Sequence, residues 1–97
     1  MSETQKIKIK DAINSSLELN SAAVEFFCEI NKLPKDDIEI DFENIVFMSR
    51  SFTQEYVSQK IKTKKNIREV NISKDILPLF KMVETIFEKS NRKLSRS

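Results

Sequence analysis

The chain has 97 residues, which is enough for one domain and too few for two. Its formal net charge is only +2, so the composition gives no strong argument for a nucleic-acid partner. Histidine and glycine are both absent, which excludes histidine-based catalytic triads, most zinc sites and glycine-rich phosphate loops. We therefore expect a protein that is not an enzyme and that uses no cofactor and no metal.

Two further features concern location and organisation. No apolar run approaches the roughly 20 residues that a membrane helix needs, and residues 1–5 are polar, without the apolar core of a signal peptide. We expect no membrane association and a cytoplasmic location. The single cysteine, Cys28, forms no intrachain disulfide, and we expect it to be partly buried. Residues 1–97 are expected to form one domain, with residues 1–5 and 90–97 flexible.

The first third of the chain predicts a strand and a helix. Residues 6–10 alternate polar and apolar side chains, as a half-buried strand does. A second short strand around Leu17 and an antiparallel neighbour for the first strand stay open. Asn20 or Ser21 is typical of a helix cap, and apolar residues at helical spacing follow until Pro34 ends the helix.

The middle of the chain predicts two strands and a second helix. Residues 38–42 alternate apolar and acidic side chains, which indicates a strand. Residues 45–48 are a short apolar run of the kind found in a central buried strand. Ser51, with Gln54 three residues later, matches a capping box, so we expect a helix from Ser51 to about Lys62.

The last third predicts one more strand and one more helix. Residues 67–72 have strand character, Asp75 is a candidate cap, and Pro78 falls in the first turn of the final helix. The apolar stripe of that helix runs from Ile76 to Phe87. The resulting β-α-β-α-β-α order predicts an α/β fold with a mixed, mostly parallel sheet of about four strands and three helices.

One segment resembles a known family. Residues 38–57 contain a strand ending in Asp-Phe, a short turn, an apolar stretch, and then Ser-Arg-Ser-Phe at the start of a helix that contains Glu. This pattern resembles the central motif of STAS-like domains, which are relatives of the STAS domains of anti-sigma-factor antagonists and sulfate transporters. The resemblance implies a STAS-like fold and a signalling or scaffold module. It also implies a protein partner, such as an ATPase of histidine-kinase type, that docks on the loop and helix starting at Ser51.

The resemblance also implies a control point. In anti-sigma-factor antagonists a kinase phosphorylates a serine at the start of this helix, within a motif that reads roughly Asp-Ser-Ser-Gly. Laid on this chain, the motif spans residues 49–52 and differs at three of its four positions, but it places the phosphorylated serine at Ser51. The alternative is that Ser51 only caps the helix. The candidate partner-binding residues are Asp41, Met48, Ser49, Arg50, Phe52, Gln54 and Glu55.

Several alternatives stay open. Asp41 is equally consistent with an ordinary strand residue that caps the turn at residues 43–44. The basic patch from Lys60 to Arg68 is either a solvated face or the contact of a nucleic-acid-associated or antitoxin-like accessory protein, although nucleic acid is the less favoured partner. A pocket for a small anion or nucleotide near Asp41 and Ser51 is a further hypothesis. We expect a monomer or a weak homodimer.

Overall fold

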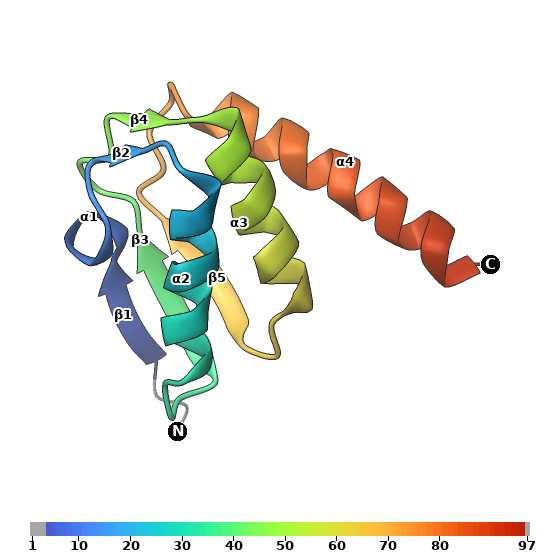
Figure 1. Cartoon of the computed structure of the whole chain (residues 1–97), viewed down its shortest axis with the longest axis horizontal. Coiled ribbons are helices and arrows are strands. Elements are labelled where there is room, and N and C mark those ends of the chain that lie inside the picture. Colours follow the sequence, from blue (N-terminus) through green and yellow to red (C-terminus); the bar gives the residue numbers. More distant parts are fainter. Residues whose placement is uncertain (1–3, 97) are drawn as a thin grey trace.

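The computed structural model of the chain describes residues 4–96, and it describes side chains for residues 4–89. Strands and helices alternate along this part of the chain (Figure 1). In chain order the elements are β1 (Thr4–Lys8), α1 (Ile9–Ala12), β2 (Ser16–Leu17), α2 (Asn20–Asn31), β3 (Asp37–Asp41), β4 (Phe47–Met48), α3 (Arg50–Lys62), β5 (Asn66–Val70) and α4 (Leu77–Arg96).

The strands form two parallel sheets. The main sheet has the order β1-β3-β5, and β2 pairs with β4 in a separate sheet of two strands. The predicted α/β class and the mostly parallel sheet are confirmed. The number of helices was wrong, because residues 4–96 contain four, and so was the antiparallel neighbour of the first strand. The short helix α1 has too few residues to produce a periodic pattern in the sequence.

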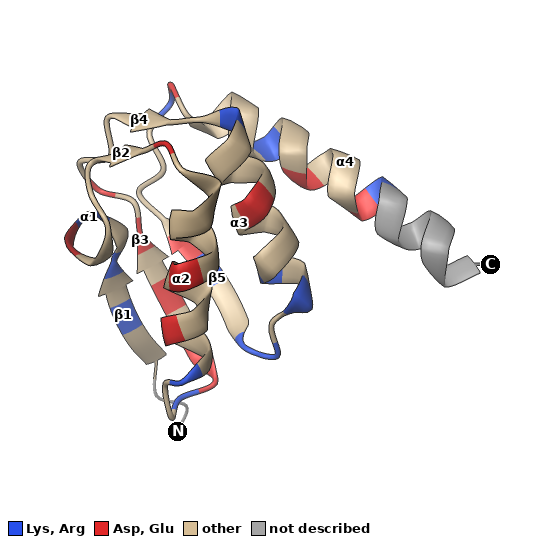
Figure 2. Ribbon diagram, viewed as in Figure 1, with Lys and Arg blue, Asp and Glu red and all other residues tan. Residues whose placement is uncertain are grey.

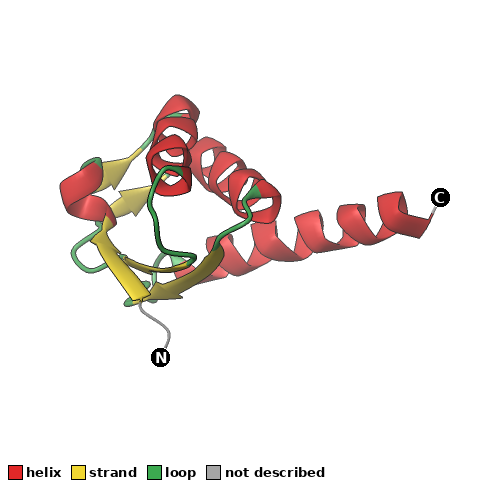
Figure 3. Cartoon of the chain, turned by 90° about the horizontal axis from the view of Figure 1, so that it is seen from below, coloured by secondary structure: helices red, strands yellow, loops and turns green. Residues whose placement is uncertain are grey.

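The two faces of the main sheet differ in character. Ile38 and Ile40 are buried beneath α2 and α3, which lie side by side over one face (Figure 3). The strand residues that alternate with these two isoleucines face the opposite side of the sheet. There Lys6, Glu39 and Arg68 occupy neighbouring positions on the three strands. Figure 2 shows the basic residues of β1 beside the acidic residues of β3.

The core is built around Tyr56, a fully buried residue of α3. Its ring centroid lies 5.1 Å from that of Phe27 on α2, 5.7 Å from that of Phe42 and 5.5 Å from that of Phe80 on α4. The pairs with Phe27 and Phe42 are edge-to-face, an arrangement that aromatic rings favour. One side chain of α3 thus contacts the second helix, the segment after β3 and the last helix.

Helix α4 is attached to the body through its first turns. Pro78 lies in the first turn, as predicted, and Phe80 and Val83 are buried. Further along, the side chain of Ile86 is 48% exposed. Figures 1 and 2 show that the described part of α4 already leaves the body at its C-terminal end. None of the helices in residues 4–96 combines the length and the apolar composition that crossing a membrane requires.

The apolar run at residues 45–48 is not the central strand that was predicted. Only Ile45 and Met48 are buried, whereas Val46 is 75% exposed and Phe47 is 48% exposed. The run forms the two-residue strand β4, which pairs with the equally short β2 at the margin of the fold. The third strand of the main sheet is β5 instead.

Two smaller expectations were also wrong. The cap of α2 is Leu19, which makes no side-chain capping bond, so neither Asn20 nor Ser21 caps this helix. Cys28 is exposed, because the buried face of α2 consists of Ala23, Phe26, Phe27 and Ile30.

We predict that two phenylalanines close together in the sequence contribute very differently to stability. Replacing the buried Phe42 by alanine leaves a cavity beside Tyr56 and should lower the free energy of unfolding by about 3–5 kcal/mol. The matched change Phe47→Ala, at the margin of the fold, should cost about 1 kcal/mol. Urea denaturation measures both, and equal losses would contradict the placement of β4.

Candidate functional site

The start of α3 is capped by Ser49 and not by Ser51. The Oγ of Ser49 accepts a hydrogen bond from the backbone N–H of Phe52 at 3.0 Å, and it donates one to the carbonyl oxygen of Glu18 at 2.7 Å. The prediction that Ser51 caps the helix was therefore wrong. Both serines fit a local capping pattern, but only Ser49 also bonds to a residue 31 positions away. Ser51 is the second residue of α3 and is exposed.

The candidate partner-binding residues divide into buried and accessible ones. Met48 and Phe52 belong to the core, with exposed fractions of 4% and 0%, so their side chains do not reach a partner and these two assignments are corrected. Arg50 and Gln54 are exposed on the first turns of α3 together with Ser51. The half-buried Ser49 is occupied by its capping bonds.

Glu55 is also half-buried, and its contact lies within its own helix. Its Oε2 accepts a hydrogen bond from the Nε2 of Gln59 at 2.9 Å. The spacing of four residues places the two side chains on one face of α3. Glu55 therefore lies beside the exposed first turns of the helix and stabilises the helix locally.

The structure adds apolar residues that the sequence did not point to. Leu19 is 68% exposed, and it follows the short strand β2, whereas Val46 and Phe47 lie at β4. The backbone N–H of Ser49 donates to the carbonyl oxygen of Leu17 at 2.8 Å, so the end of β2 runs beside the start of α3. We call this region the α3-start surface, and it consists of Leu19, Val46, Phe47, Arg50, Ser51 and Gln54.

Asp41 does not belong to this surface. It alternates with the buried Ile38 and Ile40 along β3, so its side chain lies on the face of the sheet opposite α3. Its Oδ1 accepts hydrogen bonds from the Nδ2 of Asn71 at 3.0 Å and from the backbone N–H of Glu43 at 2.9 Å. These bonds, the one from Asn71 most strongly, lower the pKa of Asp41 below its usual 3.8.

The bonds of Asp41 stabilise two turns. Asn44 and Asn71 have φ angles of 65° and 59°, the left-handed conformation that a chain without glycine gives to asparagine. The turn-capping role that the sequence left open for Asp41 therefore matches its contacts. Asp41 therefore lies on the face of the sheet opposite α3, whereas Ser51 lies on α3 itself.

Cations of the basic patch form ion pairs with carboxylates of the same chain. Arg68 on β5 forms an ion pair with Glu39 on β3, and the Nζ of Lys65 lies 3.8 Å from the Oδ1 of Asp36. Lys60 is bound to carboxylates as well. Because three cations between Lys60 and Arg68 form ion pairs within the chain, this patch is a weaker nucleic-acid contact than its sequence suggested.

The strongest ionic cluster surrounds Lys60. Its Nζ lies 2.9 Å from the Oε1 of Glu69 on β5 and 2.8 Å from the Oε2 of Glu84 on α4. The hydroxyl of Tyr56 donates to the Oε2 of Glu69 at 2.8 Å. The ammonium group also lies 5.7 Å from the ring centroid of Phe80, within the range of a cation–π contact. We call Tyr56, Lys60, Glu69 and Glu84 the Lys60 cluster.

The Lys60 cluster has perturbed pKa values. Burial, reinforced by the charge of Glu69, raises the pKa of Tyr56 well above its usual 10.0. Burial alone lowers the pKa of Lys60, but the hydrogen bonds and charges of Glu84 and Glu69 outweigh it and raise the pKa above 10.5. Perturbed groups of this kind often mark active sites. Here they bind each other, and every buried side-chain nitrogen and oxygen of the described residues has a partner, so the contacts of the cluster join α3, β5 and α4.

Comparison of the chain with protein-family models, with curated proteins and with solved structures finds no match. The resemblance of residues 38–57 to STAS-like domains therefore stays a prediction.

We predict that the two serines at the start of α3 differ in their effect on stability. Ser49→Ala removes the capping bond and the bond to Glu18, and it should lower the free energy of unfolding by about 0.5–2 kcal/mol. Ser51→Ala removes an exposed hydroxyl and should change it by less than about 0.5 kcal/mol. Urea denaturation of both variants measures the difference, and a larger loss for Ser51→Ala would contradict the assignment of the cap.

We predict that the protein loses stability in alkaline solution through Tyr56. The folded state keeps the phenolic proton above pH 10.0, where the unfolded state releases it, so the stabilisation is complete below that pH and falls as the pH rises. Lys60 acts in the same direction above pH 10.5. Tyr56→Phe removes the phenol. The free energy of unfolding should then fall less steeply with rising pH, by up to about 1.4 kcal/mol per pH unit.

Urea denaturation of both proteins between about pH 8 and about pH 11 provides this measurement. At about pH 8, Tyr56→Phe should be less stable than the wild type by about 1–3 kcal/mol, because Glu69 loses the hydrogen bond from the Tyr56 hydroxyl. Parallel stability curves over the whole range would show that Tyr56 does not titrate as described.

Proposed function

We propose that this chain is a non-enzymatic interaction module that docks a protein partner on the α3-start surface. The observation that carries the proposal is the exposure of Leu19, Val46 and Phe47 beside the exposed first turn of α3. Exposed apolar side chains with polar neighbours are typical of protein–protein contact sites. Phe47 supplies an aromatic anchor of the kind that often dominates binding energy.

The polar part of the surface defines the partner more closely. Arg50 and Gln54 are exposed next to the apolar residues, and arginine is enriched at protein interfaces. The complementary partner surface has an apolar pocket for Phe47 and a carboxylate that pairs with Arg50. The STAS-like resemblance of residues 38–57 supports an ATPase of histidine-kinase type as the class of partner.

The position of Ser51 supports a phosphorylation switch. Its exposed hydroxyl lies in the first turn of α3, where backbone N–H groups and the positive end of the helix dipole favour a phosphate. The folded state therefore accommodates the modification. The added charge of about −2 would alter a surface that otherwise carries apolar groups and Arg50, and it would repel a carboxylate of the partner. We propose that phosphorylation of Ser51 releases the partner.

The test compares matched variants of the tagged full chain as baits in native lysate, with captured proteins quantified by mass spectrometry. Phe47→Asp and Ser51→Asp should each reduce the amount of the docked partner about tenfold or more, as expected at the centre of an interface. Ile61→Asp is the control, because Ile61 is 40% exposed on the same helix but lies near its other end. It should capture as much as the wild type, and so should Ser51→Ala.

Two results would contradict the proposal. If Phe47→Asp captures every protein that the wild type captures, the α3-start surface is not the docking site. If Phe47→Asp captures less of the partner but Ser51→Asp captures as much as the wild type, the docking site is supported and the phosphorylation switch is contradicted. Circular dichroism of each bait shows that the variant is folded before its capture is compared.

A further inference from the structure

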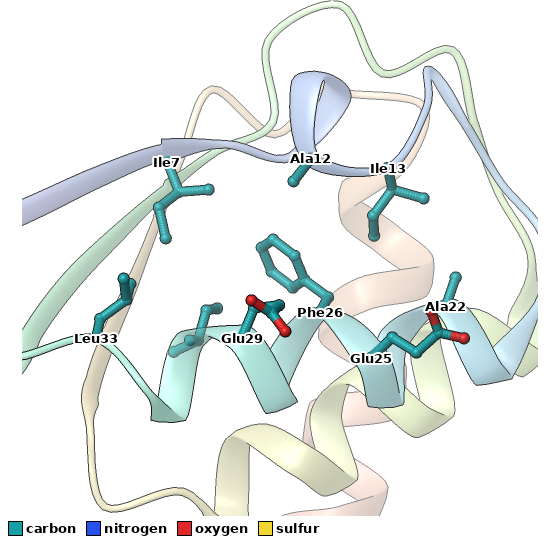
Figure 4. A pocket seen from close by; sticks show the side chains of 9 residues that line it. Ile7, Ala12, Ile13, Ala22, Glu25, Phe26, Glu29 and Leu33 are labelled. Atoms are coloured by element: carbon teal, nitrogen blue, oxygen red, sulfur yellow. The ribbon is translucent and has the colours of Figure 1, made fainter.

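An apolar groove lies on the opposite side of α2 from α3. It has a volume of about 450 Å³ and runs between α2 and the segment formed by β1 and α1 (Figure 4). Phe26 points into it between Ile7 and Ile13, and the carboxylates of Glu25 and Glu29 lie along its α2 side. The other lining residues are Ala12, Ala22, Ile30 and Leu33. The groove thus combines an apolar floor with an acidic margin.

A second surface of the same chain has the complementary character. Met82, Ile86 and Lys89 recur at helical spacing on one flank of α4. Met82 is 43% exposed and Ile86 is 48% exposed, so this apolar flank is not covered by the body. From residue 89 to residue 96 the sequence contains four basic residues and no acidic one. Among the described residues, the flank passes from the apolar Met82 and Ile86 to the basic Lys89.

We propose that the groove binds α4 of a second copy of this chain. An amphipathic helix docks into an apolar groove through side chains spaced by three, four and seven residues, which is the spacing along this flank. Ile86 and Met82 fill the groove, and Lys89 pairs with Glu25 or Glu29 at its margin. The Nζ of Lys32, the residue that follows α2, lies 3.4 Å from the Oε2 of Glu29, but both side chains are exposed, so this pair is weak and exchangeable.

The arrangement of the elements indicates that the helix bound in the groove comes from a second copy of the chain. The groove lies on the β1 side of α2, whereas α4 leaves the molecule beyond α3 on the other side (Figure 1). The helix of one molecule therefore does not reach its own groove. The contact joins two different surfaces, so a pair of chains either closes by exchanging both helices or extends into a longer assembly. This interface is separate from the α3-start surface, and its test does not depend on the proposed function.

Sedimentation equilibrium of the full-length chain tests the proposal. The wild type should self-associate at concentrations below about 1 mM. The groove variant Glu25→Lys/Glu29→Lys and the helix variant Ile86→Glu should each weaken the association about tenfold or more. Both variants change exposed side chains, so the fold should be retained, and circular dichroism checks this. The control is Val24→Glu on α2, a residue that is 43% exposed and does not line the groove. It should associate like the wild type.

Mixing the two variants gives the decisive result. The groove variant keeps an intact α4 and the helix variant keeps an intact groove, so a mixture should form a one-to-one dimer that neither variant forms alone. A wild type that stays monomeric up to about 1 mM would overturn the proposal and leave the groove to a different partner. Self-association that persists in both variants, or a mixture that forms no dimer, would overturn it as well.

Discussion

The ion pairs of Lys60 with Glu69 and Glu84 are the interaction on which the arrangement of the elements depends. They join the end of α3, the edge strand β5 and the first half of α4 at a single ammonium group. Removing the ammonium group of Lys60 would leave two partly buried carboxylates without a cation, and its cost approaches the roughly 3–5 kcal/mol of a broken buried ion pair. Tyr56 carries the same connection into the aromatic core through its bond to Glu69. Together with the buried Phe80 and Val83, this attachment holds the first turns of α4 against α3.

The two surfaces that we assign to binding consist of different residues. The α3-start surface lies where Ser49 joins the first turn of α3 to the end of β2. The groove lies on the far side of α2, and the flank of α4 extends beyond α3. No residue that lines the groove belongs to the α3-start surface, although Leu19 and Ala22 both lie at the start of α2.

Local sequence patterns predicted the elements that have two distinct faces. The alternation around Ile38 and Ile40 predicted β3 correctly, and the spacing of apolar residues predicted the three long helices. The run at residues 45–48 was misplaced because four consecutive apolar residues do not show which of them face the core. Ser49 and Ser51 are equally good caps locally, and a bond to Glu18, which is distant in the sequence, decides between them. No local sequence pattern predicted the Lys60 cluster, because its residues are separated by up to 28 positions.

Hydrogen exchange along α4 tests the role of Lys60 most directly. In Lys60→Ala the carboxylates of Glu69 and Glu84 face each other without a cation, so the amides of residues 77–89 should exchange at least about tenfold faster, while those of α2 change little. Lys64→Ala, which alters an exposed lysine in the loop after α3, should exchange like the wild type. Unchanged exchange in α4 of Lys60→Ala would contradict the account, because the helix would then be held by its apolar contacts alone.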